Sequence, residues 1–144
     1  MATIDQITDE ICIMLPKLMK GAHSNFLSKT NITSAQMIML VSIHDHGRCK
    51  LKTLAKERNI SPPTATGLID RLVKAGYVKR ESDPEDRRVV IVSLTKKGQK
   101  NVQDFLDTVK SRWKNILTHL NPKEQEQYLN ILRKIVFILS GKEG

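Results

Sequence analysis

Charged side chains crowd one short turn of this chain, between two segments rich in β-branched residues. The stretch reads YVKRESDPEDRRVVIVSLTKKG over residues 77–98, and from Asp83 to Arg88 every residue except Pro84 is charged. Asp and Pro suit the backbone of a tight turn, but such a turn does not require two adjacent arginines. The pattern predicts a β-hairpin whose Arg87 and Arg88 reach outward for an anionic partner.

A second set of polar residues lies on one face of an expected helix over residues 62–75. Ser61 is a good cap for this helix, and prolines in the first turn forfeit only amide donors that have no helical partner. The N-terminus at Ser61 also attracts phosphate through its free amides. At about 100° per residue, the inward face consists of Ala65, Leu68, Ile69, Leu72 and Val73, and the outward face and its shoulders of Pro63, Thr64, Thr66, Gly67, Asp70, Arg71 and Lys74.

This outward face is small and uncharged in its first half and charged in its second half. Small residues allow a helix to approach the floor of a DNA major groove, about 12 Å wide, where Thr64 and Thr66 could offer hydroxyl or methyl groups to base edges. Arg71 and Lys74 would then lie near phosphates and fix the register. Asp70 has two open interpretations, since it could accept from a cytosine amino group or hold Arg71 in place.

The elements that position these residues follow from hydrophobic spacing and capping signals. Two short helices separated by a three-residue turn, over 51–58 and 62–75, predict a helix-turn-helix. The terminal helices are apolar at the spacing of helices that pack on other helices, which favours pairing with a second copy of the chain. Four further helices are expected. The first ends near residue 29, the second runs from Thr33 or Ser34 to Gly47, the third from Thr95 to residue 120, and the last begins at residue 121. Strands are expected over residues 77–82 and 88–94.

Composition narrows the class of protein. The chain has 144 residues, the size of one domain, and no apolar run near the ~18 residues that a membrane helix needs. No secretory signal is visible and two cysteines make no disulfide framework, so we expect a cytoplasmic protein that is not in a membrane. The net charge is +9, and residues 48–98 hold 13 Lys and Arg against 6 Asp and Glu. Such a basic segment usually faces phosphate, an acidic partner or an anionic surface.

Taken together, residues 61–98 resemble the winged helix-turn-helix core of the MarR family of bacterial and archaeal transcription regulators. The resemblance is carried by Leu72 with Gly76-Tyr77-Val78 and Arg80, by DPEDRR in the wing, and by LTKKG after it. It implies a mainly α fold with a small β-wing and terminal dimerisation helices. The expected organisation is one protomer over 1–144, with a DNA-binding region at 33–98 and a helical dimerisation region at 1–30 and 99–144.

The resemblance also implies partners and roles. A homodimer would bind a pseudo-palindromic site on double-stranded DNA, with helix 62–75 in the major groove and wing 83–88 in the minor groove. Asp86 would steady Arg88, the arginine that enters the minor groove, and Arg87 is left for a phosphate contact. Family members usually repress, and many release DNA when a small phenolic or anionic effector enters a crevice beside the dimer helices. Candidates to line that crevice are Met14, Met19, His23 and Trp113.

Other chemistry is less well supported by the residues. Cys12 is interpreted as a small buried hydrophobe, and a redox sensor based on it is an alternative, because its position is close to that of the reactive cysteine in the hydroperoxide-sensing branch of the family. His44, His46 and Cys49 do not predict a metal site, because residues 44 and 46 lie about 200° apart on a helix. No enzyme, cofactor or metal is expected. A constitutive winged-helix protein of low specificity is the other alternative.

Overall fold

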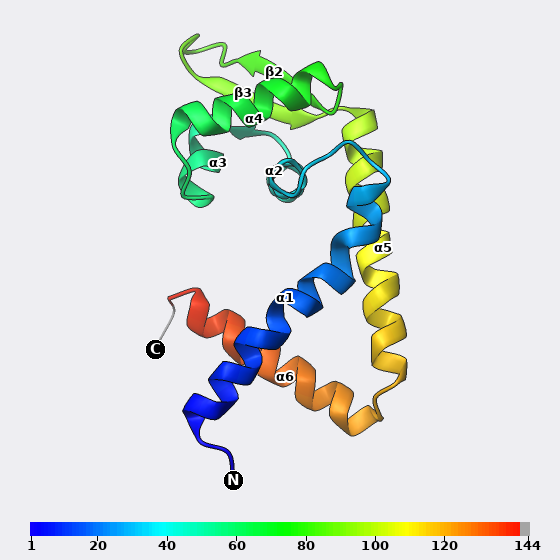
Figure 1. Cartoon of the computed structure of the whole chain (residues 1–144). Coiled ribbons are helices and arrows are strands. Elements are labelled where there is room, and N and C mark those ends of the chain that lie inside the picture. Colours follow the sequence, from blue (N-terminus) through cyan, green and yellow to red (C-terminus); the bar gives the residue numbers. More distant parts are fainter. Residues whose placement is uncertain (142–144) are drawn as a thin grey trace. The chain divides into compact units, whose positions relative to one another are not determined.

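The computed structural model describes the backbone of residues 1–141 and the side chains of residues 1–20 and 29–141. The chain divides into two compact units, residues 1–108 and residues from 109 onward, and helix α5 belongs to both. The elements are α1 (Ile4–Ser28), α2 (Ser34–His46), β1 (Cys49–Lys50), α3 (Leu51–Glu57), α4 (Pro62–Lys74), β2 (Val78–Ser82), β3 (Val90–Leu94), α5 (Lys96–Thr118) and α6 (Pro122–Leu139) (Figure 1).

The first unit holds a small antiparallel sheet in the strand order β1-β3-β2. Val78 pairs with Leu94 and Arg80 with Val92 between β2 and β3, and Cys49 pairs with Val92 between β1 and β3. Helices α2, α3 and α4 gather around this sheet (Figure 1). The predicted fold class, a mainly α winged helix-turn-helix with a small β-wing, is confirmed.

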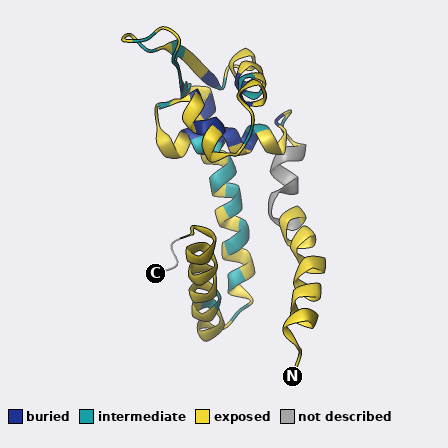
Figure 2. Cartoon of the chain, turned by 90° about the vertical axis from the view of Figure 1, so that its left-hand side faces the viewer, coloured by how far each residue is buried: buried dark blue, intermediate teal, exposed yellow. Residues whose placement is uncertain are grey.

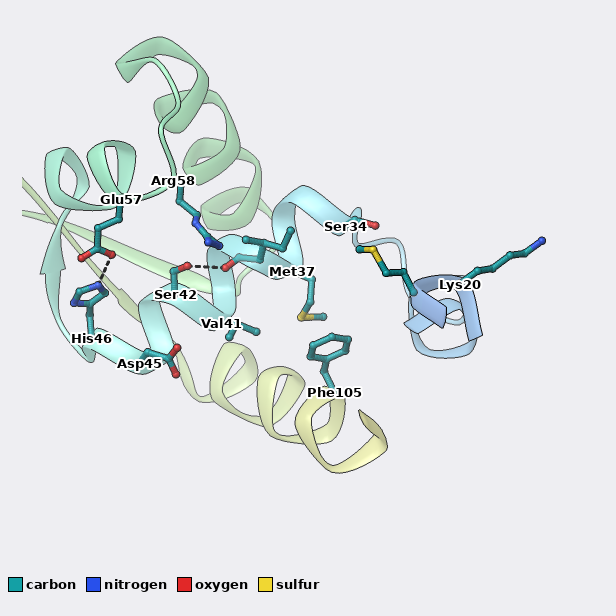
Figure 3. A pocket seen from close by; sticks show the side chains of 12 residues that line it. Lys20, Ser34, Met37, Val41, Ser42, Asp45, His46, Glu57, Arg58 and Phe105 are labelled. Carbon is teal, nitrogen blue, oxygen red and sulfur yellow. Dashed lines mark hydrogen bonds and ion pairs between the residues drawn. The ribbon is translucent and has the colours of Figure 1, made fainter. Parts of the chain in front are cut away.

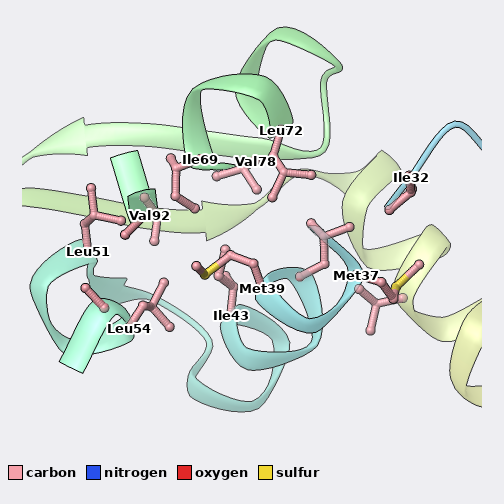
Figure 4. Packing of buried hydrophobic residues seen from close by; sticks show 14 residues of the cluster. Ile32, Met37, Met39, Ile43, Leu51, Leu54, Ile69, Leu72, Val78 and Val92 are labelled. Carbon is pink, nitrogen blue, oxygen red and sulfur yellow. The ribbon is translucent and has the colours of Figure 1, made fainter. Parts of the chain in front are cut away.

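Apolar side chains from α2, α3, α4, β2, β3 and the start of α5 form one core (Figure 4). Leu40, Ile43, Leu54, Ile69 and Val92 are completely buried. Figure 2 shows the buried residues concentrated in this part of the chain, while residues 4–20 of α1 and all of α6 are largely exposed. The residues that the core excludes from water are therefore the ones that hold the helix-turn-helix together.

Most of the residues predicted for the inward face of α4 are buried or half-buried. Ala65, Ile69 and Leu72 are at most 1% exposed and Leu68 is half-buried, as the helical spacing predicts. Val73 was expected in the core, and this is wrong, because its side chain is 36% exposed. It lies at the edge of the apolar stripe of α4, while the preceding residue, Leu72, faces the core.

Side-chain caps determine where the helices of this unit begin. Thr33 caps α2, since its hydroxyl accepts from the Gln36 amide at 3.2 Å while the Gln36 side chain accepts from the Thr33 amide at 2.9 Å. Ser61 caps α4 by accepting from the Thr64 amide at 3.3 Å. Both caps satisfy amides that have no helical partner. The α3–α4 turn also needs a left-handed residue, and Asn59 adopts φ 52° there.

The segment Thr95–Gly98 fixes the start of α5 against the end of α4. The Thr95 hydroxyl accepts from the Gly98 amide at 3.1 Å, which caps the helix as predicted. Gly98 is buried, and a Cβ atom placed on it would lie 2.1 Å from the Tyr77 carbonyl oxygen. Only glycine allows α5 to approach the backbone just before β2 this closely.

Large apolar side chains remain uncovered on both terminal helices of the single chain. On α6 they include Ile131, Ile135, Val136, Phe137 and Ile138, each at least 45% exposed. Within the second unit, Trp113 stacks on Tyr128 with ring centroids 5.7 Å apart. Among the described residues no helix combines the length and apolarity needed to cross a membrane. Among the described side chains of α1, the uncovered large apolar ones are Ile4, Ile7, Ile11, Ile13, Met14, Leu15, Leu18 and Met19.

We expect Gly98→Ala to lower the free energy of unfolding by about 1–3 kcal/mol, because the added methyl group must displace backbone. Gly67→Ala is the matched control, since Gly67 is also helical but has open space around its Cβ position. That control should raise the free energy of unfolding by about 0.5–1 kcal/mol through helix propensity. Chemical denaturation measures both, and a Gly98→Ala variant as stable as the control would contradict the close approach.

Candidate nucleic-acid interface

The outward face of α4 forms the first part of the candidate interface. Pro63, Thr64, Gly67, Arg71 and Lys74 are exposed as expected. Thr66 is half-buried, so it lies at the shoulder of the exposed surface. The helix therefore presents small uncharged residues near its N-terminus and cations near its C-terminus, in the order that base and phosphate contacts need.

Two hydroxyl groups at the start of α4 orient each other. The Ser61 and Thr64 hydroxyl oxygens lie 2.8 Å apart, in addition to the bond from the Thr64 amide to Ser61. This interaction fixes the rotamer of Thr64 before any partner arrives. A hydroxyl held in one direction loses less side-chain entropy on binding than a free one.

Gly67 has no structural reason within the chain to be glycine. It sits inside a helix, it is exposed, and an added Cβ would meet nothing within 4 Å. A helical glycine costs about 1 kcal/mol relative to alanine. The open surface at Gly67 is therefore consistent with a partner that approaches the helix closely from outside.

Asp70 holds an arginine of strand β2. Its carboxylate accepts from Arg80 Nη1 at 2.5 Å, and Arg80 lies on β2. The sequence interpretation in which Asp70 holds Arg71 is wrong, because β2 brings Arg80 across the outer side of α4. The pair links α4 directly to the strand that leads into the wing.

The wing turns over residues 83–89, because β3 begins at Val90 and not at residue 88. The Asp83 amide donates to the Val89 carbonyl at 2.9 Å, and the Val89 amide donates to the Asp86 carbonyl at 2.9 Å. Arg87 and Arg88 are therefore the two central residues of a turn at the tip. Both are exposed.

Asp86 orients Arg88 through three hydrogen bonds. Its carboxylate accepts from the Arg88 amide at 3.0 Å, from Nε at 3.1 Å and from Nη2 at 3.2 Å. The bonds from the Arg88 side chain, and then the one from its amide, hold the pKa of Asp86 below its ordinary value. The Arg88 side chain is nevertheless 92% exposed. It is oriented but free to meet a partner.

Arg87 has no hydrogen bond or ion pair among the described residues, and its side chain is exposed. Residue 87 lies in the turn at the tip of the wing and not in a strand. A phosphate contact stays a prediction for it.

The outer face of the sheet carries a charged network that the sequence did not reveal. Glu81 accepts from Arg48 Nη2 at 3.0 Å and pairs with Lys79 Nζ at 2.7 Å. The hydrogen bond from Lys79, followed by the one from Arg48, lowers the pKa of Glu81. Only the strand register could have placed Arg48, 33 residues away, next to this carboxylate.

A cavity of about 740 Å³ lies in the first unit beside α2, separate from the outward face of α4 (Figure 3). Its walls are apolar at Met37, Val41 and Phe105 and polar at the end of α3. There His46 Nε2 lies 2.6 Å from Glu57 Oε2. The other lining residues are Met19, Lys20, Ser34, Ile38, Ser42, Asp45 and Arg58.

The four effector candidates have different outcomes. Met19 lines the cavity, as predicted. Met14 is not among the lining residues, and its side chain is 53% exposed. Trp113 is also absent from the lining and stacks on Tyr128. His23 lies outside the residues whose side chains the structure describes.

The geometry around the two cysteines does not support a redox or metal site among the described residues. Cys12 is exposed, so its interpretation as a buried hydrophobe is wrong for the single chain. Burial, and then the charge of Glu57, raises the pKa of the Cys49 thiol. The described side chains contain no group of three His, Cys, Asp or Glu residues that could hold a metal ion.

We expect Asp86→Asn to weaken DNA binding by about 1 kcal/mol, because Arg88 then loses its charge-assisted partner and must be ordered on binding. Glu85→Gln is the matched control, since it removes the same charge from the neighbouring residue. General electrostatics predicts that the control binds DNA equally well or more tightly. Titrations with labelled duplex DNA would contradict the steering role if both variants changed affinity in the same direction by the same amount.

Comparisons with known proteins agree with this geometry. Residues 32–90 match the model of the MarR family. The chain is 32% identical to the uncharacterized HTH-type transcriptional regulator YfiV of Bacillus subtilis, over 81% of this chain and 75% of that protein. It is 30% identical to the HTH-type transcriptional repressor NicR of Pseudomonas putida, over 90% and 84%. The crystal structure of RV1404 from Mycobacterium tuberculosis superposes with a TM-score of 0.82 at 26% identity, over 100% and 98%.

Proposed function

The chain belongs to the MarR family of DNA-binding transcriptional regulators, and from this we propose that it is a homodimeric, sequence-specific repressor released by a small molecule. In this proposal α4 enters the major groove and Arg88 enters the adjacent minor groove of a pseudo-palindromic site. The observation that carries this proposal is the state of Arg88. Arg88 makes three hydrogen bonds to Asp86, which orient it, and its side chain is 92% exposed.

The surface of α4 supports the major-groove contact. Gly67 leaves open space at the middle of the exposed face, and Thr64 is held in one rotamer by Ser61. Arg71 and Lys74 supply charge toward the C-terminal end, where phosphates would lie. Hydroxyl and methyl groups read base edges, whereas the cations add affinity for any sequence.

An oriented arginine at the wing supports the minor-groove contact. A·T-rich DNA narrows the minor groove and concentrates negative potential there, which attracts an inserted arginine. The Asp70–Arg80 pair links strand β2, which leads into the wing, to α4. Two elements at a fixed separation can read two grooves of one site at once.

The uncovered terminal helices support the homodimer. No residue of α6 is buried in the single chain, although one side of it carries Leu132, Ile135 and Leu139. Monomeric proteins rarely expose contiguous apolar patches of this kind. A second copy related by a two-fold axis would cover the same residues on both chains and would place two winged parts on an inverted repeat.

Two further observations support the proposals that the protein is a repressor and that a small molecule releases it from DNA. The relative NicR is named a transcriptional repressor. The cavity has the size and the mostly apolar lining of a small-molecule site. It touches α3 through Glu57 and Arg58, so a ligand there would contact the helix-turn-helix itself. Compounds that raise the melting temperature and lower DNA affinity together would identify such an effector.

Selection from a library of random duplexes tests the DNA-binding mode. We expect enrichment of an inverted repeat whose half-sites lie about one helical turn apart, with A·T-rich flanks where the wings insert. The full-length chain is the bait, and Arg88→Ala is the comparison. That variant should lose about 1–3 kcal/mol of affinity and lower the salt slope by about one unit. Recovery of unrelated sequences would favour the constitutive, low-specificity alternative.

We expect Ile135→Glu to shift the chain from dimer to monomer in sedimentation equilibrium. Burial of an isoleucine side chain at an interface contributes about 1.5–3 kcal/mol to the free energy of association. In a two-fold dimer each substitution occurs in both chains, so its effect is doubled. Gln127→Glu is the control, because it adds the same charge to an exposed polar position of α6. A variant at Ile135 that sediments as wild type would exclude this face of α6 from the interface.

A further inference from the structure

The turn that follows α4 is held by residues from the start of α5. Three successive backbone carbonyls of this turn each accept a hydrogen bond from the segment Thr95–Lys97. Lys97 Nζ donates to Ala75 at 2.8 Å, the Thr95 hydroxyl to Gly76 at 2.6 Å and the Thr95 amide to Tyr77 at 3.1 Å. In Figure 1 the C-terminal end of α4 lies next to the first turn of α5.

The local geometry of α4 leaves these carbonyls available. The helix ends in a Schellman motif, in which the Tyr77 amide donates to Leu72 at 2.9 Å and the Gly76 amide to Val73 at 3.0 Å, with Gly76 at φ +85°. These bonds satisfy earlier carbonyls of the helix but not the carbonyls of Ala75 and Gly76. A helix end without partners for its last carbonyls is less well fixed.

Lys97 is suited to hold this end of the helix. Its ammonium group lies 4.6 Å from the centroid of the Tyr77 ring, and its stem would lie 3.8 Å from a Cβ atom on Gly76. The ring and the carbonyl therefore fix both the position and the direction of the side chain. A cation at a helix C-terminus also interacts favourably with the helix dipole.

We propose that Lys97 is a positioning residue for DNA recognition, which holds the C-terminal end of α4 at a set angle without contacting DNA itself. The proposal rests on α4 reading DNA. The N-terminal end of α4 is fixed by its cap and by the α3–α4 turn, and the Asp70–Arg80 pair holds its middle. Lys97 adds the third attachment and connects the helix to α5. A helix that pivots at one end changes which bases its residues reach.

Lys97→Met tests the proposal, because methionine keeps the apolar stem and removes the charge and the donor. Lys96→Met is the matched control, since Lys96 is the next residue, is exposed and makes no hydrogen bond or ion pair within the described part of the chain. Each full-length variant is titrated over a range of salt concentrations with the selected inverted repeat and with a scrambled duplex of the same composition. Thermal unfolding confirms that each variant is folded at the assay temperature.

For Lys97→Met we expect affinity for the selected site to fall roughly 3- to 30-fold, with an unchanged salt slope and unchanged affinity for the scrambled duplex. Lys97→Arg keeps a donor and a cation over the ring, so it should restore specific binding. Lys96→Met should have the same specificity ratio as the wild type, that is, the same ratio of affinity for the selected site to affinity for the scrambled duplex.

Two results would overturn the inference. Equal weakening on both duplexes, with a salt slope lower by about one unit, would make Lys97 a phosphate contact. A specificity ratio that Lys97→Met leaves at the wild-type value would show that the attachment does not set the angle of α4. Failure of the wild-type chain to prefer any duplex would instead contradict the proposed function.

Discussion

Burial of one side of α4 is the constraint on which the proposed DNA-reading surface depends. A helix of 13 residues is marginal by itself in water, so α4 is stable only because Ala65, Ile69 and Leu72 are packed in the core. Those residues fix the rotation of the helix about its axis, and the rotation decides which residues face outward. The identity of the buried residues therefore selects Thr64, Gly67 and Arg71 as the exposed ones.

Acidic residues have an unusual role on this basic surface. Three carboxylates of the winged part each hold an arginine, in the pairs Asp70–Arg80, Asp86–Arg88 and Glu81–Arg48. Exposed ion pairs of this kind add little to stability. In the proposed function their value would be geometric, because a long cationic side chain that is already oriented loses less entropy when it meets a groove or a phosphate. Negative charge near DNA is thus compatible with binding where it restricts an arginine.

Local patterns in the sequence predicted the parts of the structure that depend on neighbouring residues. The caps at Ser61 and Thr95, and the cap of α2 at one of two candidates, Thr33 or Ser34, each span three positions, so residue spacing was enough. The pairing of Asp86 with Arg88 was expected from the resemblance to the MarR family and not from spacing. The Asp70–Arg80 pair and the close approach of Gly98 to Tyr77 were missed, because both depend on how β2 lies against other elements. Most of the cavity lining was missed for the same reason, since it combines residues from four helices that no spacing rule connects.

The uncovered apolar side of α6 has a consequence for how the stability of the protein depends on its concentration. If a second copy is what covers Ile135 and its neighbours, folding and association share one equilibrium, and the melting temperature rises with protein concentration. At low abundance the chain would exist as separate copies with exposed isoleucines, which proteases and chaperones recognise. Occupancy of a two-part DNA site would then fall more steeply than protein abundance, so that a modest dilution, as in cell growth without new synthesis, would empty the site.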